Sequence, residues 1–146
     1  MKFEYKRYRT NDGPDLTRPI IRVLIRNPRD PSSSSIAYEA LVDSGADFCV
    51  FPAEIAELLQ IDLTAGEERH AGGVVAGERR PVYFHPIEIQ VGLRGDQVRR
   101  PIWAGFMPDL AENGHGILGR HGFFSGFSFV KFRDYENELQ IGARRQ

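Results

Sequence analysis

Apolar residues along the chain fall into short runs separated by glycine, proline and charged residues, which is a pattern typical of β-strands. The run Ile20-Ile21-Arg22-Val23-Leu24-Ile25 is rich in β-branched residues and predicts a strand. A second strand is predicted over Ile36 to Val42, and it runs directly into Asp43-Ser44-Gly45. The intervening stretch from Pro28 to Ser35 predicts a loop.

Helical spacing occurs in one short stretch, where Ile55, Leu58 and Leu59 share a face after Pro52. A short helix is therefore predicted over about residues 52–60, and Phe123 and Phe124 are predicted to begin another. The remaining predictions are strands over 67–75, 81–91, 98–106 (interrupted by Pro101), 127–131 and 139–141, with a partly exposed strand near the N-terminus. The predicted class is all-β with one or two short helices.

Length and composition indicate how many domains the chain forms, and which partners and locations are expected. A chain of 146 residues with 41% hydrophobic and 27% charged residues suits one folded domain. A net charge of -1 argues against a strongly basic surface, so nucleic acid is not an expected partner. No apolar run approaches the ~18 residues of a membrane span, and the first residues lack an apolar signal core. Cys49 is the single cysteine, which excludes an intrachain disulfide. We expect a cytoplasmic protein that does not bind membranes.

The most informative local feature is Ala40-Leu41-Val42-Asp43-Ser44-Gly45-Ala46-Asp47. An apolar strand there delivers Asp43 onto a tight turn of small residues, and a carboxylate at such a place needs hydrogen bonds or a proton. Small neighbours let both backbone and ligand approach the acid closely. The alternative is an ordinary Asp-Ser-Gly turn at the surface, since such tripeptides are common.

A second feature, Gly116-Ile117-Leu118-Gly119-Arg120, follows some 70 residues later. With it the chain resembles the retropepsin-like aspartic proteases, which include the retroviral proteases and bacterial single-domain relatives. The family's apolar-apolar-Asp-Ser/Thr-Gly-Ala motif is matched by Leu41 to Ala46, and its apolar-apolar-Gly-Arg motif by Ile117 to Arg120. Its glycine-rich flap is matched by Gly72 to Gly77, and the resemblance covers about residues 20 to 141.

The resemblance implies a single-lobe β-barrel over residues 19–142, preceded by an N-terminal extension (1–18, an extra strand or mobile) and followed by a tail (143–146). It also implies an aspartic endopeptidase that cleaves extended peptide or protein substrates without a cofactor or metal. Such an enzyme needs two carboxylates that share a proton and face one water. Because the chain carries one such motif, an active enzyme must be a homodimer with Asp43 from each subunit.

By the same resemblance, the residues around Asp43 take supporting roles. The Ser44 hydroxyl joins the two active-site loops, Gly45 accepts substrate backbone, and Ala46 completes the active-site loop. Asp47 lies near the substrate backbone and forms an ion pair with Arg120, for which a guanidinium is suited. The flap residues expected to bind substrate are Gly72, Gly73, Val74 and Val75.

The chain departs from the family at two positions, where Cys49 replaces a usual Ser or Thr and His121 replaces a usual Asp or Asn. We expect these two residues to be near neighbours, with Cys49 a small buried thiol. The alternative is a nucleophilic Cys-His dyad, in which a nearby charged histidine would favour the thiolate.

Other readings of the chain remain as alternatives. Gly114 to Gly119 fits G-x-G-x-x-G, but no βαβ unit surrounds it, so a nucleotide site is not expected. The four histidines lack zinc-like spacing. The main rival function is a catalytically inactive module that keeps the fold and binds a peptide or protein. A structural or assembly protein would need an extended apolar patch that the sequence does not single out.

Overall fold

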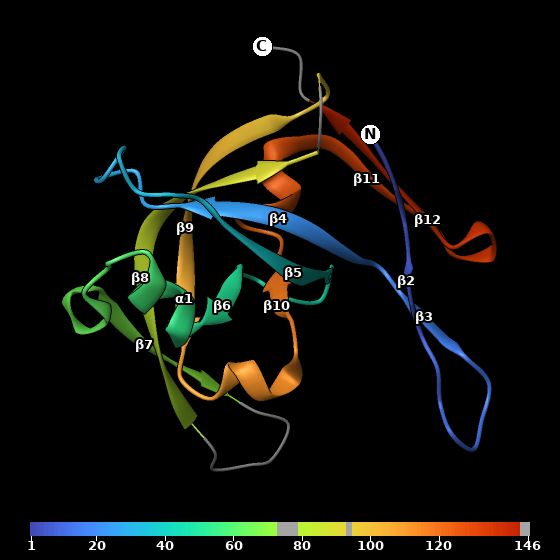
Figure 1. The fold of residues 1–146 in the computed structure, drawn as a ribbon, viewed down its shortest axis with the longest axis horizontal. Coiled ribbons are helices and arrows are strands. Elements are labelled where there is room, and N and C mark those ends of the chain that lie inside the picture. Colours follow the sequence, from blue (N-terminus) through green and yellow to red (C-terminus); the bar gives the residue numbers. More distant parts are fainter. Residues whose placement is uncertain (73–78, 93–94, 144–146) are drawn as a thin grey trace.

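The computed structural model describes residues 1–72, 79–92 and 95–143, and strands dominate it (Figure 1). The strands are β1 (Lys2–Glu4), β2 (Lys6–Tyr8), β3 (Leu16–Arg18), β4 (Ile20–Arg26), β5 (Ile36–Val42), β6 (Val50–Pro52), β7 (Glu67–Gly72), β8 (Arg79–Val91), β9 (Val98–Met107), β10 (Gly116–Leu118), β11 (Phe127–Arg133) and β12 (Glu138–Ala143). The helical elements are α1 (Ala53–Leu58) and the 3-10 turns Leu63–Ala65, Leu110–Asn113, Phe124–Gly126 and Asp134–Glu136.

Six strands close into a barrel in the order β4-β5-β10-β6-β9-β8, because β8 pairs with both β9 and β4. β7 extends this sheet as the neighbour of β8. Most of these pairings are antiparallel, but β10 runs parallel to β5 and β6 runs parallel to β9. A closed barrel leaves few unpaired strand edges, which suits a small domain built from short strands.

The short strand β10 lies between β5 and β6, two strands that are far earlier in the chain. Ile117 is opposite Leu41 on one side and Val50 on the other. The glycines at the ends of this stretch make room for it, since a Cβ on Gly116 would lie 2.8 Å from the Phe51 ring. Strand β10 therefore holds together the beginning and the end of the loop that contains Asp43.

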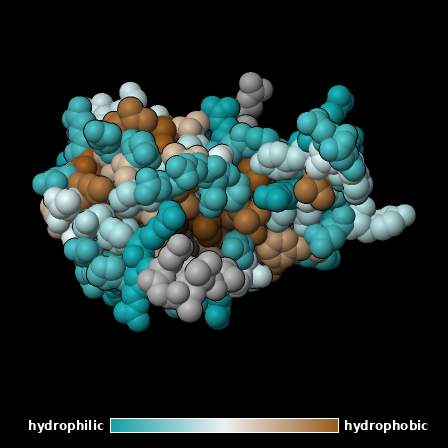
Figure 2. All heavy atoms as spheres, turned by 90° about the horizontal axis from the view of Figure 1, so that it is seen from below, coloured by the Kyte–Doolittle hydropathy of each residue, from teal (hydrophilic) through white to brown (hydrophobic). Residues whose placement is uncertain are grey.

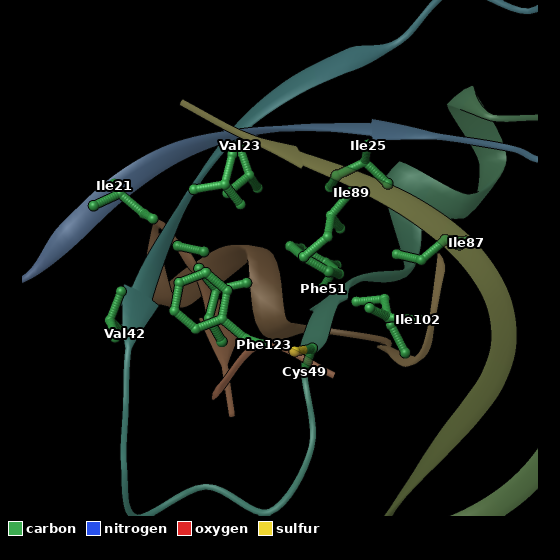
Figure 3. Close-up of a cluster of buried hydrophobic side chains, with 14 of the residues drawn as sticks. Ile21, Val23, Ile25, Val42, Cys49, Phe51, Ile87, Ile89, Ile102 and Phe123 are labelled. Atoms are coloured by element: carbon green, nitrogen blue, oxygen red, sulfur yellow. The ribbon is translucent and has the colours of Figure 1, made fainter. Parts of the chain in front are cut away.

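The barrel interior is filled by β-branched and aromatic side chains from opposite walls (Figure 3). Val23 and Ile25 of β4 face the interior together with Ile87 and Ile89 of β8, and all four are buried. Phe51, Cys49 and Phe123 pack beneath them. This core fixes the strands whose ends carry the acidic loop.

Two arms extend from the barrel on the side where β5 ends (Figure 1). The first is the β2–β3 hairpin, and the second is the β11–β12 hairpin, on which β1 pairs to form a three-stranded sheet in the order β1-β12-β11. Three hydrogen bonds join the first arm to the turn between β11 and β12: Tyr5 Oη to Asp134 Oδ1 at 2.6 Å, Thr17 Oγ1 to Asn137 Oδ1 at 2.7 Å, and the Tyr5 amide to the Asn137 carbonyl at 2.8 Å.

The all-β prediction is confirmed, and the strand predicted over 36–42 has the predicted bounds. The predicted helix over 52–60 is shorter, because Pro52 precedes it as an extended residue and Gln60 adopts a left-handed conformation (φ 58°). The break expected at Pro101 is wrong, since β9 is continuous through it. The N-terminal extension forms β1, β2 and β3, while residues 144–146 of the expected tail lie outside the described residues.

Candidate active site

Asp43 is the first residue after β5, and its side chain is half-buried at the barrel rim. Its Oδ1 accepts a hydrogen bond of 2.9 Å from the amide of Gly45, and its own carbonyl accepts one of 3.2 Å from the amide of Ala46. A Cβ on Gly45 would lie 3.2 Å from Asp43 Oδ1, so a glycine suits this turn. The carboxylate is thereby oriented through Oδ1.

The loop of Asp43 and the stretch after β10 are joined by a series of backbone hydrogen bonds. The amide of Asp43 donates to the Leu118 carbonyl at 3.0 Å, and the amide of Arg120 donates to the Ala46 carbonyl at 2.8 Å. The amide of His121 donates to the Asp47 carbonyl, also at 2.8 Å. The two motifs that the sequence analysis singled out are thus one structural unit.

The predicted ion pair between Asp47 and Arg120 is not formed in this single chain. The ion pairs within 4.0 Å among the described residues do not include these two side chains. Both side chains are exposed, so water can solvate each charge without a partner. Their loops are joined through the backbone bond of Arg120 instead.

Cys49 and His121 are neighbours, as predicted, but they do not form a dyad. The Cys49 thiol donates at 3.8 Å to the backbone carbonyl of His121, while the His121 ring packs against the Phe48 ring with centroids 5.5 Å apart. Burial raises the pKa of the Cys49 thiol to about 11. A fully buried thiol that stays protonated is a poor nucleophile, which leaves Cys49 as a packing residue.

A groove of about 520 Å³ begins where the active-site loop continues past Asp43. Ala46 and Asp47 form one wall, β7 contributes Arg69 to the other, and Ile117 lies among the apolar side chains that complete the lining. On the face seen from below, hydrophobic residues gather in the middle and hydrophilic residues surround them (Figure 2). A groove of this kind can hold an extended chain with apolar side chains.

Arg69 closes this groove on the β7 side, and it packs on three aromatic rings at once. Its guanidinium carbon lies 4.8 Å from the centroid of Trp103, 5.5 Å from Phe84 and 5.8 Å from Phe48. The same guanidinium is 3.2 Å from Glu67 on its own strand. The sequence analysis missed this cluster, because its members come from four separate segments and a lone arginine in a strand gives no local signal.

The structure places the predicted active-site residues in two groups. Ser44 and Gly45 are exposed beside Asp43, and Ala46 is half-buried at the groove. Gly72 ends β7, whereas Gly73, Val74 and Val75 of the predicted flap lie outside the described residues. Within residues 1–72, 79–92 and 95–143, no three His, Cys, Asp or Glu side chains are placed to bind a metal ion. The same ranges contain no helix long and apolar enough to span a membrane.

No protein-family model matches the chain, and no curated protein matches it by sequence. Solved structures, by contrast, match the chain. One is a crystal structure of a retropepsin-like aspartic protease from Rickettsia conorii, with a TM-score of 0.58 and 18% identity over 97% of this chain and 89% of that one. EIAV protease complexed with the inhibitor HBY-793 matches with a TM-score of 0.41 and 21% identity over 77% of this chain and 88% of that one. The first likeness shows that the chain has the retropepsin-like fold.

Proposed function

We propose that this chain is an aspartic endopeptidase that works as a homodimer, with Asp43 of each subunit in one active site. The observation that carries the proposal is the placement of Asp43: it follows a barrel strand, its Oδ1 is oriented by the Gly45 amide, and its loop lies beside an apolar groove. The retropepsin-like fold supports the proposal, because the solved protein from Rickettsia conorii is described as an aspartic protease.

The proposed reaction needs two carboxylates that share one proton and hold a water between them. The ionised Asp43 takes a proton from the water, and the resulting hydroxide attacks the carbonyl carbon of the peptide bond. The protonated Asp43 of the other subunit gives its proton to the carbonyl oxygen. When the tetrahedral intermediate collapses, the carbon–nitrogen bond breaks and the Asp43 that took the water proton gives it to the leaving nitrogen. The other Asp43 takes a proton from a hydroxyl of the intermediate as the new carboxyl group forms, so both carboxylates return to their starting state.

The other site residues bind and position the substrate in this proposal. The exposed Ser44 joins the two active-site loops across the dimer, and Gly45 and Asp47 meet the substrate backbone. Gly72, Gly73, Val74 and Val75 are assigned to substrate binding, as the resemblance implies. The apolar lining of the groove next to Ala46 selects apolar side chains on one side of the cleaved bond.

The test is cleavage of a mixed peptide library, read by mass spectrometry at several pH values. Wild type is compared with Asp43→Asn, which keeps the shape of the side chain and removes the charge, and with the matched control Asp96→Asn in an exposed loop. We expect wild type and the control to cut at the same bonds and Asp43→Asn to lose at least about 10³-fold in rate. Equal cutting by all three would assign the activity to another residue or to a contaminant. If none cuts although the chain is dimeric, the chain is an inactive binding module.

A further inference from the structure

Arg69 is the one permanent cation among the described residues that line the apolar groove. The other ionisable side chains of that lining belong to Asp47 on the opposite wall and to His70, the next residue of β7. A guanidinium stays charged at every pH at which a protein is folded, so the β7 wall carries a fixed positive charge. The proposed function gives this charge no role.

We propose that Arg69 determines the specificity of the groove, by selecting peptides with a Glu or Asp two positions away from the apolar residue that fills it. The inference rests on the proposed function, and it names the substrate class: an apolar residue, any residue, then an acidic one, read in either direction along the peptide. The guanidinium binds the acidic side chain while the apolar side chain is buried in the rest of the lining.

Three aromatic rings and one carboxylate hold the guanidinium of Arg69 in place before any peptide binds. The rings are those of Phe48, Phe84 and Trp103, with centroids 5.8, 5.5 and 4.8 Å from the guanidinium carbon. The carboxylate of Glu67 accepts hydrogen bonds from Nε and Nη2 through a single oxygen, each at 3.2 Å. A side chain fixed in this way loses little conformational entropy when it binds an anion.

Glu67 leaves part of the guanidinium available to a ligand. The group carries five N–H donors in a planar fork, and among the described residues no hydrogen bond is made by Nη1 of Arg69. The Arg69 side chain is 46% exposed, so a peptide can approach it from solvent. A carboxylate matches the fork with two parallel hydrogen bonds, whereas an amide offers one acceptor oxygen, so the site distinguishes Glu from Gln.

The geometry of an extended peptide sets the position of its acidic residue. Residues two positions apart lie on the same face of an extended chain, separated by roughly 6.6 Å along it. When one side chain enters the apolar lining beside Val50 and Ile117, the side chain two residues away is the next that can reach the groove walls. Asp47 repels a carboxylate on its own wall, which confines the acidic side chain to the wall that carries Arg69.

Arg99 supplies a matched control for the loss of one positive charge. It is also an exposed strand residue, and its Nε donates a hydrogen bond of 3.0 Å to Gln90. It lines a separate hollow, together with Arg26 and Glu88. Replacing either Arg69 or Arg99 by Gln lowers the net charge by one and weakens long-range attraction of acidic peptides. A change of specificity confined to the Arg69 variant is therefore a local effect.

The first experiment measures kcat/KM for peptides based on a sequence that the chain cuts, with Glu, its neutral isostere Gln, or Lys two residues from an apolar side chain. We expect wild type and Arg99→Gln to prefer Glu over Gln at least about fivefold, Arg69→Gln to lose this preference, and Arg69→Glu to prefer Lys. A variant that merely loosens β7 would slow all three peptides alike. No preference in wild type, or the same preference in Arg69→Gln, would overturn the inference.

Peptide binding to the Asp43→Asn chain separates this inference from the proposed function. Trp103 is the single tryptophan and lies beside the Arg69 guanidinium, so its fluorescence reports binding there. The probes are the blocked heptapeptide Ala-Glu-Ala-Leu-Ala-Glu-Ala and the same sequence with Gln for Glu. We expect the Glu peptide to bind at least about fivefold more tightly at about 50 mM salt, and the difference to shrink at about 0.5 M. Equal binding, or binding of neither peptide, would reject the acidic preference even if the chain cuts peptides. Preferential binding by a wild-type chain that cuts nothing would reject the protease alone.

Discussion

The amide of Asp43 donates a hydrogen bond to the carbonyl oxygen of Leu118 at 3.0 Å. This bond joins two residues that are 75 positions apart, and it sets the start of the active-site loop against the end of β10. The position of the acid therefore depends on a segment that is remote in sequence, and changes in that segment should act on Asp43 without contacting substrate.

Gly119 lies in this remote segment, and a substitution there should have a large effect on the Asp43 loop. A Cβ at this position would meet the backbone carbonyl oxygens of Phe48 and Ala46, the latter at 2.8 Å. Backbone atoms cannot move aside easily, so Gly119→Ala is expected to lower the free energy of unfolding by about 2–3 kcal/mol and to abolish cleavage. Urea unfolding and the peptide assay check both effects. Gly13→Ala is the control, because its new Cβ would meet only the Thr10 hydroxyl at 3.3 Å, and a similar loss there would contradict the explanation.

Cys49 should make stability depend on pH in the alkaline range. Burial raises the pKa of its thiol from 9.0 to about 11, so the folded chain holds this proton more tightly than the unfolded chain does. The resulting stabilisation is complete below about pH 9 and is lost as the pH rises through about 11, and the total is about 2–3 kcal/mol. Urea unfolding of wild type and Cys49→Ala between about pH 8 and pH 11 measures it. The mutant profile should be flatter, and parallel profiles would show that the thiol does not contribute.

Arg69 should hold β7 against the barrel. Its guanidinium packs on the rings of Phe48, Phe84 and Trp103, and one such contact at an exposed site is worth about 0.5–1 kcal/mol. Arg69→Gln is expected to cost about 1 kcal/mol and to speed hydrogen exchange in β7 more than in β4. The matched control is Arg80→Gln, since Arg80 stands opposite Ala71 on the neighbouring strand β8. Equal effects of the two changes would assign the loss to charge alone.

The bond between Tyr5 and Asp134 should couple the two arms. Burial, together with the bond to Asp134, raises the pKa of the Tyr5 hydroxyl, so the hydroxyl stays protonated and donates. Tyr5→Phe and Asp134→Asn should each lower stability by about 1 kcal/mol, with a coupling energy of about 0.5–1.5 kcal/mol in the double mutant. Additive losses would mean that the 2.6 Å contact carries no energy of its own.

Local patterns predicted most of the barrel. The run that became β4 could be read from its β-branched residues, and Ile21, Val23 and Ile25 of that run are buried at alternate positions. The break expected at Pro101 failed for a reason that lies in the sheet. Residues 105–107 of β9 pair with β6, whereas Pro101 faces only Glu88 of β8, so its missing N–H removes no hydrogen bond to a second neighbour.

The sequence motifs of the candidate site could be predicted, but the contacts between residues far apart in the chain could not. Asp43 and the Gly116–Arg120 stretch could be recognised because each is continuous in sequence. The aromatic support of Arg69 and the bond from Tyr5 to Asp134 join residues far apart in the chain, and they depend on how the sheets are placed. The expected ion pair of Asp47 and Arg120 shows the same limit, because matching residue types do not establish that two exposed side chains meet.

The position of β10 between β5 and β6 also bears on how the chain behaves during synthesis. Asp43 leaves the ribosome long before Gly116 to Leu118 exist, so the strand that positions its loop is still missing. Until then the edges of β5 and β6 that β10 will occupy are open, and they can pair with other strands. A nascent chain therefore lacks an ordered Asp43 loop in that interval, and it is also most prone to aggregate then.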